Sequence, residues 1–118
     1  MVRVKALLRR GPASLVQTQW IADLEIDKLH QEVKRAGRRI ELTPKEYSLL
    51  EYLVANTDRV VSRTMIMEHV WDQSFEGLTT IVDVYVRHLR AKIDDPFPEK
   101  LIRTVRGVGY RLAEGEAA

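Results

Sequence analysis

The stretch that decides the fold is TIVDVYVRHLRAKI, residues 80–93. When successive side chains are turned by about 100°, as in an α-helix, the apolar ones gather on one side. Val82, Val86, Leu89 and Ile93 then lie within about 60° of one another, as in a helix that packs one stripe against a core. The pattern predicts a buried amphipathic helix that begins at Thr79 or Thr80.

The opposite side of this predicted helix has the chemistry of a surface that reads DNA. Small or hydrogen-bonding side chains predominate there, and they would let the backbone approach the floor of a major groove. Arg87 is suited to guanine O6 and N7, and Val84 to a thymine methyl group. Thr80 and Arg90 are better suited to phosphates, which set the register of a protein on DNA. His88 lies beside this face, and Ile81 and Tyr85 turn partly inward.

A plainer alternative exists for the same side of the helix. It would be an ordinary exposed helix face, stabilised by an ion pair between Asp83 and Arg87 at the i,i+4 spacing.

The residues after the helix favour DNA reading over that alternative. Two short strands are predicted at 101–105 and 110–112, joined by Arg106-Gly107-Val108-Gly109. The glycines permit a tight turn and a close approach of the backbone to DNA. An arginine at such a tip fits a narrow minor groove, and Thr104 shares its face. We therefore predict a hairpin wing that contacts DNA.

The preceding residues complete an α+β domain. Residues 19–42 alternate in hydropathy and predict three or four short antiparallel strands, with a turn at Ala36-Gly37. Thr43-Pro44-Lys45-Glu46 is a capping box that begins a helix running to about residue 56. Ser62 caps a second helix that reaches about residue 71. The inward side chains predicted for this second helix are Met65, Ile66 and Val70. The predicted fold is a winged helix-turn-helix with an N-terminal antiparallel β-sheet, a three-helix core and a C-terminal β-hairpin.

Composition and charge narrow the classes of function. The 118 residues include no cysteine, which excludes disulfides and thiolate metal sites, and no apolar run is long enough to cross a membrane. His30, His69 and His88 fall on separate elements without metal-ligand spacing, and no carboxylate is paired with a nucleophile. We therefore expect neither enzyme activity nor a cofactor.

The net charge of +2 is segregated along the sequence: residues 18–78 carry −3 and residues 79–112 carry +3. Such segregation is typical of a domain that binds a polyanion.

With these segments in place, residues 22–112 resemble the C-terminal effector domain of OmpR/PhoB-type response regulators. The resemblance rests on four motifs in the family's order: LTPKEY at 42–47, VSRT at 61–64, VDVYVRHLR at 82–90 and TVRGVGY at 104–110. It implies that two protomers bind a direct repeat in promoter DNA. His88 stands where several relatives carry arginine.

The resemblance also implies a set of functional residues and partners. The DNA-contacting positions that it implies are Arg63, Trp71, Thr80, Ile81, Val84, Tyr85, Arg87, His88, Arg90, Thr104 and Arg106. The loop that it implies to contact RNA polymerase consists of Asp72, Gln73, Ser74, Phe75, Glu76, Gly77 and Leu78. A receiver domain and a sensor histidine kinase are the further partners that it implies, in the cytoplasm.

The domain organisation is expected to follow the same family. Residues 1–10 resemble the end of the last receiver helix, 11–17 a linker, 18–113 the DNA-binding domain and 114–118 a tail. We expect most of the receiver to be missing, and the chain to be a monomer that pairs on DNA. The alternative function is a winged helix used for protein–protein contact without sequence-specific DNA reading.

Overall fold

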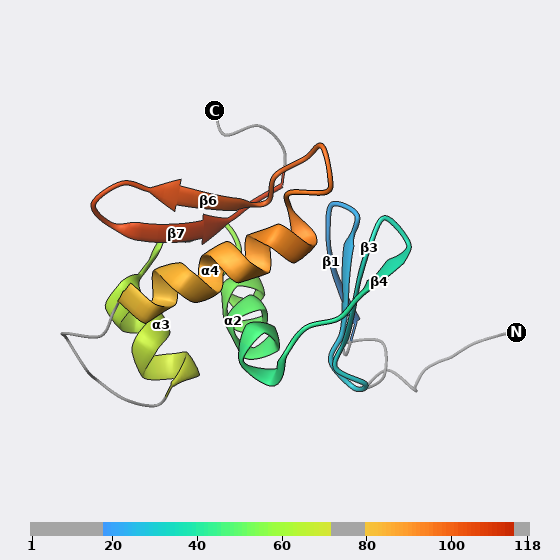
Figure 1. The fold of residues 1–118 in the computed structure, drawn as a ribbon, viewed down its shortest axis with the longest axis horizontal. Coiled ribbons are helices and arrows are strands. Elements are labelled where there is room, and N and C mark those ends of the chain that lie inside the picture. Colours follow the sequence, from blue (N-terminus) through green and yellow to red (C-terminus); the bar gives the residue numbers. More distant parts are fainter. Residues whose placement is uncertain (1–17, 72–79, 115–118) are drawn as a thin grey trace, which may run out of the picture. The chain divides into compact units, whose positions relative to one another are not determined.

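The computed structural model describes residues 18–71 and 80–114, and its elements confirm the predicted α+β architecture. An antiparallel sheet is followed by three helices and a C-terminal hairpin (Figure 1). The chain divides into two compact units, Met1–Glu41 and Leu42–Ala118. Within the described ranges, no helix has the length and apolar character needed to cross a membrane.

The first unit contains a four-stranded antiparallel sheet in sequence order. Its strands are β1 (Thr18–Ile21), β2 (Leu24–Asp27), β3 (Glu32–Arg35) and β4 (Arg38–Ile40). The turn between β3 and β4 lies where it was predicted, with φ of 54° at Ala36 and 79° at Gly37. Positive φ at both central residues matches the right-handed twist of paired strands. The sheet therefore follows directly from the alternation and the turn signal in the sequence.

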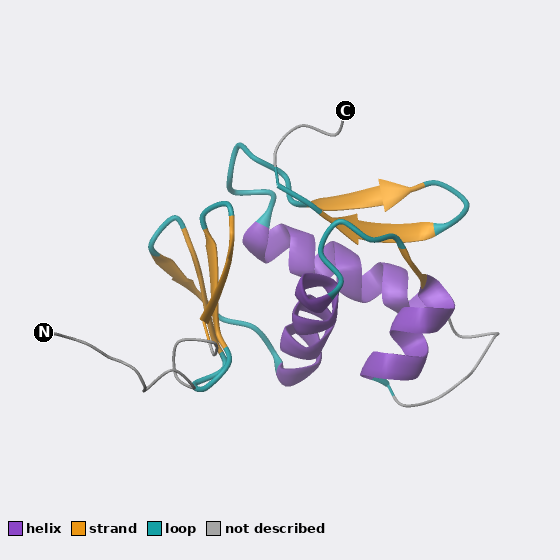
Figure 2. Ribbon diagram, turned by 180° about the vertical axis from the view of Figure 1, so that it is seen from behind, coloured by secondary structure: helices purple, strands orange, loops and turns teal. Residues whose placement is uncertain are grey.

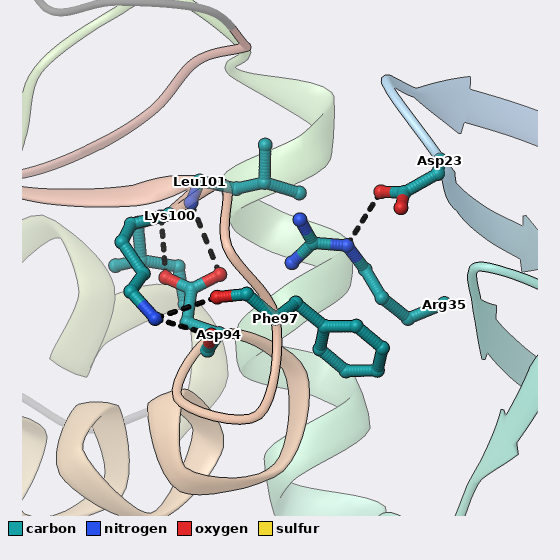
Figure 3. A network of polar contacts seen from close by, with 7 residues as sticks. Asp23, Arg35, Asp94, Phe97, Lys100 and Leu101 are labelled. Atoms are coloured by element: carbon teal, nitrogen blue, oxygen red, sulfur yellow. Dashed lines mark hydrogen bonds and ion pairs between the residues drawn. The ribbon is translucent and has the colours of Figure 1, made fainter.

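One ion pair joins the turn before β2 to the end of β3. The Nε atom of Arg35 donates to Oδ1 of Asp23 at 2.6 Å, and the Arg35 side chain is fully buried (Figure 3). The backbone N–H of Ala36 also donates to the carbonyl oxygen of Asp23 at 3.0 Å. A buried guanidinium needs an anion beside it, because an unpaired buried charge is costly. Asp23 supplies that partner.

The second unit begins with the predicted capping box. In α2 (Pro44–Ala55), the backbone N–H of Glu46 donates to the Thr43 hydroxyl, and the Thr43 N–H donates to the Glu46 carboxylate at 2.9 Å. The same carboxylate accepts from the Lys92 ammonium at 2.7 Å. Burial raises the pKa of Glu46, but the hydrogen bonds from Lys92 and Thr43 outweigh this and lower it. The cap thus ties α2 to the third helix of the unit.

The second helix confirms its predicted cap and corrects one predicted core residue. α3 (Arg63–Val70) is capped by the Ser62 hydroxyl, which accepts from the backbone N–H of Met65 at 3.0 Å. Ile66 is buried as predicted, but the Met65 side chain is 44% exposed and Met67 is buried instead. Met65 and Met67 are two residues apart and therefore point about 200° apart around the helix, so only one of them can face the core.

The third helix, α4 (Thr80–Ile93), packs on both α2 and α3 (Figures 1 and 2). Its predicted stripe of Val82, Val86, Leu89 and Ile93 is completely buried. Nearly parallel to α4 runs the hairpin of β6 (Ile102–Val105) and β7 (Gly109–Leu112). The turn of this hairpin lies at the end where α4 begins.

The hairpin belongs to a three-stranded sheet that was not fully predicted. The additional strand, β5 (Val61–Ser62), pairs with β7, at a place where no strand was predicted. This pairing also corrects the role assigned to Gly109. A Cβ on Gly109 would lie 2.0 Å from the carbonyl oxygen of Val61, so Gly109 makes room for β5 and not for DNA. Gly107 has φ of 75° and serves the tight turn as predicted.

A buried carboxylate fixes the passage from α4 into β6. The backbone N–H groups of Leu101 and Ile102 donate to the two carboxylate oxygens of Asp94 at 3.0 and 2.9 Å (Figure 3). The Lys100 ammonium donates to backbone carbonyl oxygens at this end of the helix, including that of Asp94 at 3.0 Å and that of Phe97 at 2.6 Å. A cation is favourable at a helix C-terminus, where unpaired carbonyl groups concentrate negative potential. The wing therefore starts from a defined position.

Candidate nucleic-acid interface

The outward side of α4 presents the residues predicted to read bases. Thr80, Arg87 and His88 are exposed, and Val84 is 37% exposed. Arg87 forms no hydrogen bond or ion pair with another described residue, so none of these residues occupies its guanidinium donors. Ile81 and Tyr85 are half-buried, as the helical wheel indicated. This side combines an exposed cation with a small apolar side chain.

The alternative interpretation of this side of α4 is wrong in its central contact. Asp83 does not pair with Arg87. Its carboxylate instead accepts from the Nε atom of Arg63 at the start of α3, at 2.7 Å. The i,i+4 spacing permitted the intrahelical pair, but a cation from another helix occupies the carboxylate. Arg87 is left exposed as a result.

The tip of the wing carries a second exposed arginine. Arg106 precedes Gly107 in the turn between β6 and β7 and has no polar partner among the residues described. Thr104, two residues before Arg106 in β6, is also exposed. The exposed cation on a narrow hairpin matches the shape and charge needed to enter a minor groove.

Arg63 and Tyr110 meet at Asp83, so three elements converge there. The Tyr110 hydroxyl of β7 donates to the same carboxylate oxygen that accepts from Arg63. Burial raises the pKa of Asp83, but the hydrogen bonds from Tyr110 and Arg63 outweigh burial and lower it. Burial and the bond to Asp83 raise the pKa of Tyr110, so its hydroxyl remains a donor at neutral pH.

Arg90 joins α4 to the wing at a second point. Its Nη2 atom donates to the carbonyl oxygen of Ile102 at 3.1 Å and to the hydroxyl of Thr104 at 2.6 Å. Its guanidinium also lies 5.5 Å from the centre of the Tyr110 ring. Arg90 and Thr104 were both predicted to contact DNA, and in the structure they are hydrogen-bonded to each other.

Trp71 lies at the end of α3 within a row of aromatic side chains. Its ring meets that of Tyr85 edge to face, with centroids 5.1 Å apart, and the Tyr85 and His88 rings are 6.1 Å apart. The Lys45 ammonium lies 5.5 Å from the centre of the Trp71 ring and donates to the carbonyl oxygen of Val70 at 3.3 Å. The row holds Trp71 beside the outward side of α4.

The predicted site residues fall into two groups by what holds them. Arg87, Arg106, Thr80 and Val84 project from α4 and the wing, whereas Arg63 and Arg90 are engaged in the contacts between these elements. The predicted polymerase loop, 72–78, lies outside the described residues. Sequence reasoning missed Asp83 and Tyr110 as members of the site. The sequence did contain a signal for Asp83. Asp83 and Arg90 are seven residues apart, so their side chains point within about 20° of each other on one side of the helix, beside the predicted DNA-reading face.

The remaining titratable groups among the described residues lie in separate local contacts. Across residues 18–71 and 80–114, no three histidine, aspartate or glutamate side chains come together as a metal site would require. His69 stacks on Tyr52 with centroids 4.3 Å apart, and His30 pairs with Asp27 at 2.9 Å on the surface. The three histidines therefore lie in separate local contacts, as their spacing indicated.

Comparison with known proteins places this architecture in a family. The family described as "Transcriptional regulatory protein, C terminal" matches residues 37–112. The transcriptional regulatory protein CusR of Escherichia coli K12 is 47% identical over 113 residues, which cover 95% of this chain and 50% of CusR. TcrA of Mycobacterium tuberculosis is 44% identical over 110 residues, covering 93% and 44%. The chain thus spans about half the length of the curated relatives it matches.

Solved structures show the same fold. The DNA-binding domain of Klebsiella pneumoniae RstA, in complex with the RstA box, is 25% identical with a TM-score of 0.74, covering 82% of this chain and 97% of that one. The AdeR DNA-binding domain, in complex with an intercistronic region, is 28% identical with a TM-score of 0.72, covering 82% and 100%. The chain belongs to the family of C-terminal domains of transcriptional regulatory proteins and is a winged-helix DNA-binding domain of the OmpR/PhoB response-regulator type.

Proposed function

We propose that this domain controls transcription by placing α4 in the major groove of promoter DNA and the wing tip in the adjacent minor groove. The observation that carries the proposal is the exposure of two arginines, Arg87 on α4 and Arg106 on the wing, neither of which is bonded to another described residue. Exposed cations on a helix face and on a hairpin tip match the two grooves of B-DNA. The DNA complexes of RstA and AdeR, which share the fold, support this use of the surface.

The proposed roles differ along the surface. Arg87 reads a guanine, Val84 contacts a thymine methyl, and His88 reads a neighbouring base. Thr80 contacts a phosphate and sets the register of the helix in the groove. Ile81 and Tyr85 are proposed as lesser contacts, because both are half-buried. Arg63, Trp71, Arg90 and Thr104 lie at the edge of this surface, where backbone phosphates would pass.

The proposed partners beyond DNA follow from the response-regulator type. Two protomers would bind a direct repeat, and residues 72–78 would contact RNA polymerase. In the whole protein, a receiver domain phosphorylated by a sensor histidine kinase would control binding, and the protein would act in the cytoplasm. The family is one of transcriptional regulators, so we assign the domain no catalytic reaction and no cofactor.

The decisive experiment is a selection of binding sites from random duplexes. We expect the chain to enrich a repeated half-site, with both repeats in the same orientation. Affinity for the selected duplex should then fall steeply as salt rises, by about 0.9 log units per log unit of salt for each neutralised phosphate. A scrambled duplex of equal composition serves as the control. Equal affinity for both duplexes, or a flat salt response, would favour a winged helix used for protein–protein contact.

A further inference from the structure

Asp83 is an acidic residue on a surface proposed to bind a polyanion. It lies in the first turn of α4, and its side chain is 38% exposed. A carboxylate here repels phosphates, so a residue with no other role would be expected to weaken DNA binding. Removing it would then strengthen binding. The contacts of Asp83 predict the opposite.

The first of these contacts joins three elements at one atom. Oδ1 of Asp83 accepts from the Nε atom of Arg63 at 2.7 Å and from the hydroxyl of Tyr110. These residues come from α4, α3 and β7, and the Asp83–Tyr110 contact links positions 27 residues apart in sequence. The carboxylate therefore holds the start of α4 against both the preceding helix and the wing.

A second contact, two turns along the helix, completes a brace between α4 and the wing. Arg90 lies on the same side of α4 as Asp83 and donates to Ile102 and Thr104 of β6. The Arg63 and Arg90 guanidinium groups lie 5.7 and 5.5 Å from the centre of the Tyr110 ring, within the range of cation–π attraction. The pairing of β5 with β7 already holds one side of the hairpin, and these two contacts hold it along α4.

The brace also sets how Arg63 is presented. The bond from its Nε atom to Asp83 and the Tyr110 ring beneath its guanidinium hold the Arg63 side chain from two sides. Since an arginine side chain has many rotamers, holding it in one geometry before binding lowers the entropic cost of the phosphate contact. Asp83 thereby positions two groups that are proposed to contact DNA, the wing and Arg63, without itself contacting DNA.

We propose that Asp83 is a positioning residue for DNA binding, which fixes the wing against α4 and orients Arg63, so that its negative charge increases affinity for the specific site. This inference rests on the proposed function of α4 and the wing. The inference predicts the direction in which affinity changes. Neutralising Asp83 lowers affinity for the selected duplex, although it makes the surface more positive.

The test compares Asp83→Asn with Asp95→Asn, a matched control. Asp95 is exposed just beyond α4, and its side chain has no polar partner among the described residues. We expect Asp83→Asn to lower affinity for the selected duplex about tenfold, and to leave or raise affinity for the scrambled duplex. Footprint protection of the minor groove beside the half-site should be lost. Asp95→Asn should change neither the ratio of the two affinities nor the footprint.

Tyr110→Phe provides a milder second variant should Asp83→Asn fold poorly. It removes only the hydroxyl that donates to Asp83 and keeps the ring that packs beneath Arg63 and Arg90. We expect a loss of specific affinity of about threefold and a weaker wing footprint. If both Asp83→Asn and Tyr110→Phe bind the selected duplex as tightly as the wild type or more tightly, the inference is overturned.

A measurement without DNA separates this inference from the proposed function. Hydrogen exchange of the β6 and β7 amides should accelerate in Asp83→Asn but not in Asp95→Asn, because the brace would be lost whatever the wing contacts. Unchanged exchange would refute the brace even if the chain reads DNA. Failure of the wild type to discriminate between the duplexes would refute the proposed function, while the exchange result still reports on the brace.

Discussion

The inner and outer sides of α4 are held by different kinds of contact. On the inner side, Val82, Val86, Leu89 and Ile93 are completely buried among apolar neighbours. On the outer side, Arg87 is exposed and bonded to no other described residue. One helix therefore separates folding from binding by the direction in which each side chain points. Between the two sides, Asp83 and Arg90 connect the helix to the wing, so changes there should affect both properties.

The largest expected effect is on the inner side. Leu89→Ala should lower the free energy of unfolding by about 2–5 kcal/mol, because it removes buried methyl groups and leaves a cavity. Urea unfolding followed by circular dichroism measures this loss. Ala91, exposed on the outer side, offers the matched control: Ala91→Ser should change stability by less than about 0.5 kcal/mol. Similar losses in both variants would break the distinction between the two sides.

The next effect belongs to the outer side. Arg87→Ala should weaken binding to the selected duplex by about 1–3 kcal/mol and relax the choice of base at one position, if the contact to guanine is bidentate. Its free energy of unfolding should stay within about 0.5 kcal/mol of the wild type. Fluorescence anisotropy measures the affinity of each variant for the selected and the scrambled duplex. Unchanged discrimination would remove Arg87 from the base-reading residues.

A smaller effect is expected where α4 joins α2. Glu46→Gln keeps an acceptor for the Thr43 N–H but loses the charge opposite Lys92, and should cost about 1 kcal/mol of stability at pH 7. The pKa of Glu46 in the folded protein is below its ordinary 4.5, so this contribution is present above about pH 4.5 and is lost as the pH falls through the folded pKa. Urea unfolding at several pH values checks this. An equal difference between variant and wild type at pH 7 and pH 3 would contradict it.

The smallest expected change in sequence preference comes from the wing tip. Arg106→Ala should weaken binding but alter discrimination between the selected and scrambled duplexes by less than about 1 kcal/mol, except where the minor groove is A·T-rich and narrow. Footprinting of the wild type should show protection beside the major-groove half-site, which the variant lacks. A wild-type footprint confined to the major groove would argue against a wing contact.

Much of the site could be predicted because its signals are local. The buried stripe of α4 follows from a period of 3.6 residues, and the cap at Thr43 from a four-residue motif. The turn at Ala36-Gly37 follows from the left-handed conformation that glycine adopts readily. The methionines of α3 show the limit of such reasoning, because a helix of eight residues gives few apolar positions from which to fix its rotation.

The sequence by itself determined which side of α4 is buried and which side, with the wing tip, carries arginines toward solvent, since both depend on the order of neighbouring residues. Only the tertiary structure decided the partner of Asp83, which had two candidates of opposite consequence, Arg87 four residues away and Arg63 in another helix. It also decided that Gly109 accommodates β5. Contacts between residues distant in the chain depend on how the elements pack, and no local pattern encodes that packing.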